Sequence, residues 1–272
     1  MTTQKEKGEL FRALHGRDKA FVIPNPWDVG TARMLELLGF EALATTSGGY
    51  AFSVGRLDGT VDREEMMEHL VEIASSSELP VSADLGNGFG DAPEVAAESI
   101  RLAADAGVVG GSIEDATGRA GDPIYEHELA AERVRAAAEV ARRLSFPFTL
   151  TARAENYLHG RADVKDTIKR LQLYQAAGAD VLYAPGILSK EEIAAVVSAV
   201  DRPVNVLMGL KGAALSVEKL SELGVRRISV GSALARAAYG AFLRAAQEMR
   251  EGTFTFTEKT VSTAELSRLL TR

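Results

Sequence analysis

Short apolar runs alternate with longer helical patterns along this chain, eight times and without a long linker. Each run has the alternating or fully apolar character of a strand that lies in a buried sheet. Eight strands, each followed by a helix, predict an α/β fold, the closed parallel (β/α)8 or TIM barrel; an open doubly wound sheet is the alternative. The expected strands are residues 20–24, 42–46, 80–85, 108–113, 147–152, 179–184, 203–208 and 226–231.

The helical patterns between these runs often end in a glycine that leads directly into the next expected strand. A glycine in this place is typical of a helix C-cap. The glycines concerned are Gly39, Gly107, Gly178 and Gly224. The main helical patterns are residues 10–14, 31–38, 63–75, 92–106 and 129–144.

The chain is long enough for one barrel and a little more. Its 272 residues are close to the ~250 that are usual for this fold, so we expect residues 1–272 to form a single barrel domain. Residues 232–272 exceed what a last helix needs, because a helical pattern over 233–250 is followed by a second one over 263–270. We expect this C-terminal helical extension to pack on another subunit or over the base of its own barrel.

Composition excludes several classes of function. The net charge of −7 and the absence of a basic stripe argue against a nucleic-acid partner. The chain has no cysteine, which excludes disulfides, thiolate metal sites, Fe–S clusters and cysteine nucleophiles. The N-terminus lacks the apolar core of a signal peptide, and no apolar run is long enough to cross a membrane. We therefore expect a cytoplasmic protein with no membrane partner.

Lysines and histidines are not placed for the commonest barrel chemistries. No lysine lies within the final turn of an expected strand, which disfavours a Schiff-base enzyme. The four histidines, His15, His69, His127 and His159, have no metal-ligand spacing, so a zinc site is not expected. His15 and His69 are expected on helix surfaces. No glycine-rich dinucleotide motif or Walker sequence opens a helix.

Three consecutive expected strands carry polar side chains where a barrel interior is normally apolar. Alternation places Ser82 and Asp84, then Ser112 and Glu114, on the faces opposite their apolar neighbours, and the fifth strand continues the pattern with Arg153. Because neighbouring strands lie about 4.8 Å apart, Asp84, Glu114 and Arg153 should converge over one small volume. Asp84 is followed by a loop with three glycines, 86–90, that allows a ligand to approach the backbone.

Two interpretations of this cluster remain open. In one, Arg153 and Glu114 form an internal ion pair that only stiffens the barrel. In the other, Asp84 and Glu114 hold a hard divalent cation, Mg²⁺ or Mn²⁺ in its place, with several waters retained. Arg153 would then bind a substrate carboxylate through two hydrogen bonds.

Other candidate binding residues lie after the second, first and seventh strands. The Thr-Thr-Ser-Gly-Gly-Tyr segment includes Ser47, Gly48 and Gly49. Its hydroxyl and backbone N–H groups are suited to bind an anionic end of a substrate. Such a run is also a common turn. Trp27 follows the first strand and is either packing or a wall of the pocket. Asn205 lies inside the seventh strand and is either structural or directed at the substrate.

In these segments the chain resembles the isocitrate lyase and phosphoenolpyruvate mutase superfamily over nearly its whole length. The order and spacing of the segments carry the resemblance, rather than any single motif. The segments are Pro-Asn-Pro-Trp-Asp at 24–28, Thr-Thr-Ser-Gly-Gly at 45–49, Asp58, Ala-Asp and Gly-Phe-Gly within 83–90, Ser-Ile-Glu-Asp at 112–115 and Thr-Ala-Arg at 151–153.

The resemblance implies a barrel whose eighth helix is exchanged between the subunits of a homo-oligomer, a dimer or a tetramer. It also implies a Mg²⁺ site and a small 2-oxo acid or related dicarboxylate as substrate. The roles that it implies are Asp84 and Glu114 around the metal, Asp58 supporting it, Ser47 and Gly48 on the substrate carboxylate, and Arg153 opposite them. Arg153, Glu114 and Asp58 are the expected catalytic residues.

The chain departs from its relatives in the loop that follows Asp115. The lyases carry a cysteine there that supplies the catalytic proton, and the mutases carry Lys and Asn, whereas this chain reads Ala-Thr-Gly-Arg-Ala-Gly-Asp-Pro. Many relatives also have a second Asp where this chain has Ser82, and some have Glu where it has Gly86. These changes predict a more hydrated metal site.

We therefore predict a Mg²⁺-dependent lyase that breaks a carbon–carbon bond in a small 2-oxo or 2-hydroxy di- or tricarboxylate, in the manner of an oxaloacetate decarboxylase or a methylisocitrate lyase. Residues 116–126 are expected to close over the site, and Glu155 and Tyr50 are candidate proton donors. The alternatives are carbon–phosphorus chemistry, as in the phosphonopyruvate mutases and hydrolases, and a barrel that binds a 2-oxo acid without catalysis.

Overall fold

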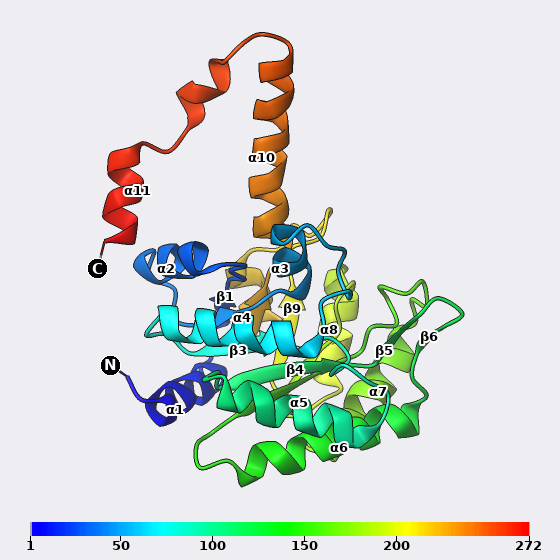
Figure 1. Ribbon diagram of the computed structural model, residues 1–272. Helices are drawn as coiled ribbons and strands as arrows, with labels where there is room; N and C mark the ends of the chain where they lie inside the picture. Colours follow the sequence, from blue (N-terminus) through cyan, green and yellow to red (C-terminus); the bar gives the residue numbers. More distant parts are fainter. Residues whose placement is uncertain (1, 272) are drawn as a thin grey trace.

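Eight parallel strands form one sheet that curls into a nearly closed barrel (Figure 1). The computed structural model describes residues 2–271. The sheet runs in the order β1-β10-β9-β8-β7-β4-β3-β2, and the backbone N–H of Ala44 donates to the carbonyl of Pro24 at 3.1 Å where its two edges meet. The barrel strands are β1 (Phe21–Ile23), β2 (Leu43–Ala44), β3 (Val81–Asp84), β4 (Gly110–Glu114), β7 (Thr149–Arg153), β8 (Val181–Tyr183), β9 (Val204–Leu207) and β10 (Arg227–Ser229). All eight predicted strands are present, which confirms the barrel and excludes the open sheet.

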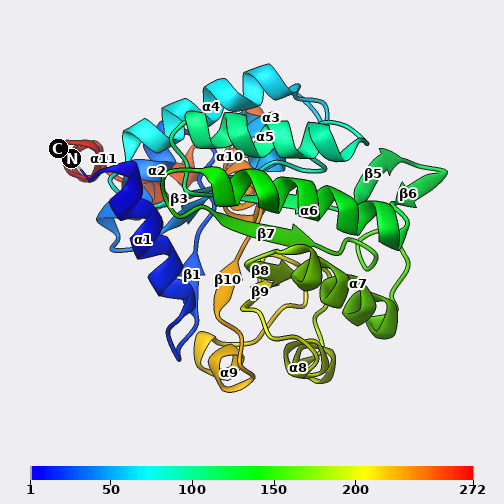
Figure 2. The ribbon, with the colours of Figure 1, turned by 90° about the horizontal axis from the view of Figure 1, so that it is seen from below.

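Helices surround the strands, as Figure 2 shows from below. The predicted glycine caps are also present; at the end of α7, for example, Gly178 adopts the left-handed φ of 111°. The helices are α1 (Gln4–His15), α2 (Val29–Leu37), α3 (Ser47–Ser53), α4 (Arg63–Ser76), α5 (Pro93–Asp105), α6 (His127–Arg143), α7 (Val164–Ala177), α8 (Lys190–Ser198), α9 (Val217–Glu222), α10 (Ala233–Arg250), the 3₁₀ helix η1 (Thr255–Lys259) and α11 (Thr263–Leu270).

The main core lies between the sheet and the surrounding helices. Outward-facing strand residues such as Ile113, Leu150 and Ala152 are at most 1 % exposed and pack against these helices. A second cluster, which includes Phe11, Leu14 and Phe21, closes the amino-terminal end of the barrel with α1. With that end blocked, a ligand has access only from the carboxyl ends of the strands.

Two helix residues that were expected at the surface are buried. His15 is 6 % exposed and packs edge-on against Phe11 and Phe21, and His69 is 3 % exposed and stacks on Tyr50 at 3.9 Å. The prediction was wrong because the two rings lie on the inward faces of α1 and α4. Loss of hydration lowers the pKa of His15 to about 3 and that of His69 to about 4, so both rings are neutral at physiological pH.

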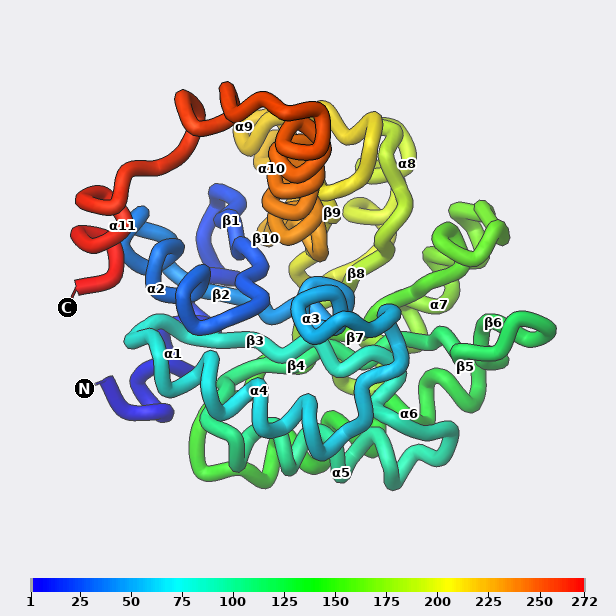
Figure 3. The backbone as a smooth tube through the Cα atoms, turned by 45° about the horizontal axis from the view of Figure 1, so that its top comes forward, coloured from blue at the N-terminus to red at the C-terminus, as the bar shows by residue number. Residues whose placement is uncertain are grey.

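The segment that follows β4 is an ordered hairpin rather than an irregular loop. β5 (Ala116–Arg119) pairs antiparallel with β6 (Asp122–Ile124), and the hydroxyl of Thr117 donates to the carbonyl of Asp122. Figure 3 shows that this hairpin projects beyond the barrel strands. The sequence did not predict it, because this glycine-containing segment lacks the alternation of a strand.

The C-terminal extension begins with α10, which stands away from the barrel (Figures 1 and 3). Ala235 is its one buried residue among those described, whereas Phe242 is 67 % exposed and Leu243 is 64 % exposed. η1 follows it, and α11 then returns to lie against α2. Among residues 2–271, no helix combines the length and apolar character that a membrane crossing would require.

Candidate active site

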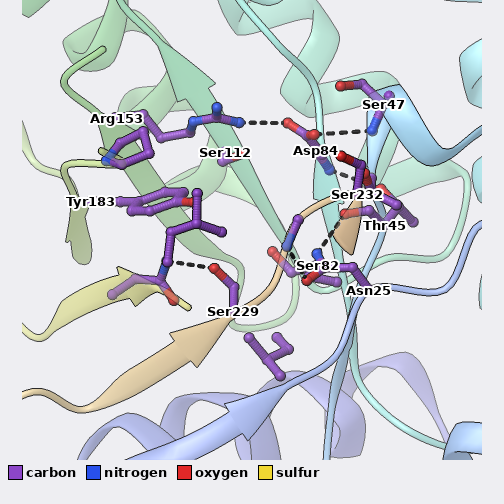
Figure 4. Close-up of a pocket in the computed structure, with 18 of the residues that line it drawn as sticks. Asn25, Thr45, Ser47, Ser82, Asp84, Ser112, Arg153, Tyr183, Ser229 and Ser232 are labelled. Atoms are coloured by element: carbon purple, nitrogen blue, oxygen red, sulfur yellow. Dashed lines mark hydrogen bonds and ion pairs between the residues drawn. The ribbon is translucent and has the colours of Figure 1, made fainter. Parts of the chain in front are cut away.

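Asp84, Glu114 and Arg153 meet at the carboxyl end of the barrel, each as the last residue of its strand. Arg153 Nη1 lies 2.8 Å from Asp84 Oδ1, and Arg153 Nη2 lies 3.0 Å from Glu114 Oε2. Figure 4 shows Arg153 extended toward Asp84 across the pocket. The predicted convergence of these three side chains over one small volume is therefore present in the structure.

Strand register explains this convergence. β4 lies between β3 and β7, with Asp84 beside Ser112 and Glu114 beside Arg153. Inward-facing positions below these residues carry small hydroxyl side chains, such as those of Ser82 and Ser112, which leave open space in the barrel.

Arg153 is fully engaged by carboxylates. Its third nitrogen, Nε, donates to Glu155 Oε1 at 2.8 Å, so each guanidinium nitrogen has an acidic partner. Attraction by Glu155, Glu114 and Asp84 outweighs the loss of hydration and raises the pKa of Arg153 well above its usual value. The ion pair between Arg153 and Glu114 exists, but it is one part of a larger acidic cluster.

The carboxylates of this cluster outnumber the cation. Burial raises the pKa of Glu114 to about 8, with Arg153 opposing the shift and Glu155 and Asp84 adding to it. Burial is also the main cause of the raised pKa of Glu155. Asp58 has a raised pKa too, from loss of hydration and from the charge of Asp84. When all of its carboxyl groups are ionised, the site has an excess of negative charge, which either proton uptake or a further cation would relieve.

The chemistry of these donors fits Mg²⁺. The ion prefers oxygen ligands and usually takes only one or two protein carboxylates, with waters completing its shell. Within residues 2–271 no group of three or more His, Cys, Asp or Glu side chains is arranged to enclose a metal. Asp84 and Glu114, with Asp58 nearby, are therefore suited to a largely hydrated ion and not to a closed protein cage.

The segment after β2 forms the helix α3, which the sequence analysis treated as a loop. Thr46 caps this helix, and the backbone N–H of Ser47 donates to Asp84 Oδ2 at 3.0 Å (Figure 4). Gly48 lies against Asp58: a Cβ at this position would be 2.8 Å from Asp58 Oδ2. This close approach gives a physical reason for glycine at position 48.

Two cavities open at this end of the barrel. The smaller, of about 150 Å³, extends into the barrel, and the larger, of about 500 Å³, reaches the β5–β6 hairpin. Residues that line both cavities are Ser47, Asp58, Asp84, Arg153 and Leu158.

Of three further residues that were predicted to bind substrate, one lines a cavity and two do not. Asn205 is 1 % exposed and lines the smaller cavity, where its amide is bonded to Ser229 and Arg227. Gly49 and Trp27 line neither cavity; a Cβ at Gly49 would lie 3.2 Å from the Cβ of Trp27, which places the tryptophan behind α3. A substrate contact for Trp27 or Gly49 stays a prediction.

Arg227 and His159 are among the residues that line these cavities and that the sequence analysis did not propose for the site. Arg227 of β10 lies inside the barrel and is 5 % exposed. His159, which is exposed, lies at the rim of the larger cavity. A usable signal existed for Arg227, because it alternates with Ser229 as the polar residues of β3, β4 and β7 do. No local pattern distinguishes His159 from an ordinary loop residue.

Tyr50, a candidate proton donor, lines neither cavity, and its hydroxyl lies 3.4 Å from Glu65. Glu155 lines the larger cavity, where its contact with Arg153 holds it. Its neighbour Asp115 is turned away into a buried network, in which Tyr174 and Arg170 donate to its carboxylate.

Comparison with known proteins gives a consistent result. The family described as phosphoenolpyruvate phosphomutase matches residues 11–250. A protein from Burkholderia cenocepacia J2315, assigned to the lyases or mutases without a stated substrate, has 62% identity and a TM-score of 0.97, covering 99% of this chain and 97% of that one.

Two relatives have named activities. Oxaloacetate decarboxylase of Pseudomonas savastanoi pv. phaseolicola is 28% identical over 271 residues, covering 96% of this chain and 90% of the relative. The structure of an oxaloacetate acetylhydrolase with its product oxalate has 26% identity and a TM-score of 0.87, covering 99% of this chain and 95% of that one.

Proposed function

The chain belongs to the phosphoenolpyruvate phosphomutase family, whose named relatives are lyases and mutases, and from this we propose that it is a Mg²⁺-dependent carbon–carbon bond lyase acting on a small 2-oxo or 2-hydroxy carboxylate. One observation carries the proposal: Asp84, Glu114 and Arg153 converge where two cavities meet at the open end of the barrel. This is the end at which barrel enzymes carry out their chemistry.

Asp84 and Glu114 would hold the metal, and Asp58 would support it from the adjacent loop. A bound Mg²⁺, or Mn²⁺ in its place, would stabilise the negative charge that develops beside the substrate carboxylate when the bond breaks. Gly48 allows Asp58 to approach closely, and the N–H of Ser47 orients Asp84 through its hydrogen bond. These contacts hold the carboxylates in place before substrate binds.

Arg153 would balance the charge of the acidic cluster and supply a cation at the substrate's level. In the structure its nitrogens all donate to Asp84, Glu114 and Glu155. A cation shared with Asp84 and Glu114 would weaken two of these contacts and free part of the guanidinium for a carboxylate. The β5–β6 hairpin borders the larger cavity and is suited to exclude water from it.

Carbon–carbon cleavage releases CO2 or a fragment that carries the new carbonyl, and it leaves an electron pair on the other carbon, next to a ketone or carboxylate already present in the substrate. That carbon must gain a proton. We assign delivery of that proton to His159. His159 lines the cavity that Glu114 and Arg153 also line, in a chain that has no cysteine to supply the proton.

A substrate panel tests the proposal. Purified protein with Mg²⁺ is incubated with oxaloacetate, methylisocitrate and phosphonopyruvate, and products are followed by coupled assay and NMR. Pyruvate forming from oxaloacetate or methylisocitrate faster than with Mg²⁺ alone supports the lyase. Turnover of phosphonopyruvate alone would replace it with carbon–phosphorus chemistry, and calorimetric binding without turnover would indicate a non-catalytic barrel.

We further propose that the protein acts in the cytoplasm as a homo-oligomer, a dimer or a tetramer, and that a small carboxylate is its natural partner. The exposed apolar residues of α10 support the oligomer, because Phe242 and Leu243 have no cover from their own barrel.

A further inference from the structure

The inner end of the smaller cavity contains a buried arginine that has only neutral partners. Arg227 Nε donates to Asn205 Oδ1 at 3.0 Å, and Nη2 donates to Thr151 Oγ1 at 3.0 Å. Nη1 is buried and has no hydrogen-bond partner within residues 2–271. The arginine is 5 % exposed and lines the cavity, so its positive charge lies at the cavity wall inside the barrel.

The surroundings of Arg227 do not neutralise its charge. The cavity lining includes the hydroxyl groups of Ser82, Ser112 and Ser229, and its two carboxylates, Asp58 and Asp84, belong to the acidic cluster at the carboxyl end of the barrel. His15, beneath it, is neutral. No carboxylate forms an ion pair with Arg227 in the described chain. A buried cation without a counter-ion is costly, so this arrangement favours an anionic ligand.

The position of Arg227 in the smaller cavity, and the extent of this cavity up to Arg153, indicate which anion could reach it. Thr151 precedes Arg153 by two residues on β7, so the contact with Thr151 places the Arg227 guanidinium about 6.6 Å below the level of the Arg153 backbone. The same cavity is lined by Ser47, Gly48 and Arg153 at its upper end. Its volume of about 150 Å³ is far more than the roughly 10–15 Å³ that one water needs.

We propose that Arg227 binds the distal carboxylate of a dicarboxylate substrate, whose first carboxylate lies at the level of Ser47 and Arg153. This assignment rests on the proposed function, because it uses the same cavity. Arg227 is the better cation for this role, since Arg153 is already held by three carboxylates whereas the hydrogen-bond partners of Arg227 are the neutral side chains of Asn205 and Thr151. Arg227 is thereby assigned as the residue that distinguishes a carboxylate from a neutral group at the distal end of the substrate.

Binding measurements on the full chain test this assignment without any turnover. Succinate and succinamate, which has one carboxylate replaced by an amide, are titrated calorimetrically at saturating Mg²⁺, with oxalate as a ligand too short to reach Arg227. We expect succinate to bind at least about 30-fold more tightly than succinamate. Arg227→Met should abolish this preference and leave oxalate affinity unchanged, whereas Arg227→Lys should retain part of it.

Asn205→Asp provides a second variant in case Arg227→Met does not fold. Its carboxylate keeps the hydrogen bond to Arg227 Nε but neutralises the guanidinium, so the preference for succinate should be lost there too. The assignment is overturned if wild type does not distinguish succinate from succinamate or binds neither. It is also overturned if Arg227→Met keeps the preference or loses oxalate in parallel. If no substrate is turned over, the proposed lyase activity is wrong, but the binding measurements still decide the assignment of Arg227.

Discussion

Arg153 Nη1 lies 2.8 Å from Asp84 Oδ1, so a side chain of β7 reaches over β4 to a side chain of β3. The other oxygen of Asp84 accepts the N–H of Ser47. Asp84 therefore connects the acidic cluster to α3. A metal ion at Asp84 would change the position of both the arginine and this helix end.

Asp84→Ala should abolish Mg²⁺-dependent ligand binding and leave the fold intact. Loss of an outer-sphere partner already weakens metal binding by about 10–100-fold, and loss of a direct ligand should weaken it more. Calorimetric titration with Mg²⁺ and oxalate measures the effect. Asp105→Ala, which removes an exposed carboxylate on α5, is the matched control. Unchanged affinity in Asp84→Ala would show that the metal assignment is wrong.

Arg153→Met should lower the free energy of unfolding of the metal-free protein by about 3–5 kcal/mol, because three carboxylates lose their counter-ion in a site that is mostly shielded from water. Mg²⁺ should restore more stability to this variant than to wild type, since it would neutralise the same carboxylates. Urea unfolding with and without Mg²⁺ measures both effects. Equal stabilisation of the two proteins by Mg²⁺ would place the ion elsewhere.

Much of this architecture could be predicted from the sequence, because strand alternation is a local property. The inward-facing Ser82 and Asp84, and the matching residues of β4 and β7, were evident from period two alone, and their convergence followed from the spacing of strands. The prediction failed where the structure depends on contacts between residues that are far apart in the sequence. α3 contains two glycines in succession and is supported by its Thr46 cap and by packing near Trp27 and Ala235.

The buried arginine and histidine show a second limit. The alternation of Arg227 with Ser229 indicates an inward-facing side chain, but whether a carboxylate pairs with it depends on residues of the other strands. His15 shares the face of α1 that carries Phe11, so its burial was readable at helical spacing. The neutral state of His15 could not be predicted from the sequence, because it depends on how tightly Phe11 and Phe21 enclose the ring.

Gly48→Ala should lower kcat/KM by up to about 100-fold with little change in stability. The added Cβ would lie 2.8 Å from Asp58 Oδ2 and displace that carboxylate, and an error of about 1 Å in a site can have this effect. Gly121→Ala is the control, since nothing lies within 4 Å of a Cβ there. Comparable activity in the two variants would show that the position of Asp58 does not matter for catalysis.

His15 should make the fold sensitive to acid. Its pKa is about 3 in the folded protein, below the ordinary 6.5, so its stabilising contribution is complete above pH 6.5 and is lost as the pH falls toward 3. Between pH 7 and pH 5 the loss should be about 2 kcal/mol. Urea unfolding at several pH values should show a shallower dependence for His15→Gln than for wild type. Parallel curves would mean that the ring is already protonated or accessible to water.

Oligomerisation should depend on the apolar residues of α10. This helix stands off the barrel with Phe242 67 % exposed and Leu243 64 % exposed, and such side chains are usually covered by another surface (Figure 1). We expect wild type to be a dimer or tetramer in light scattering, and the double variant Phe242→Glu with Leu243→Glu to be a monomer that keeps its helical circular dichroism. Val71→Glu, on the outer face of α4, is the control, because that apolar side chain is 50 % exposed yet lies on a helix packed on its own barrel. A monomeric wild type, or an assembly that survives the double substitution, would separate α10 from subunit association, because two buried glutamates could not remain in an apolar interface without partners.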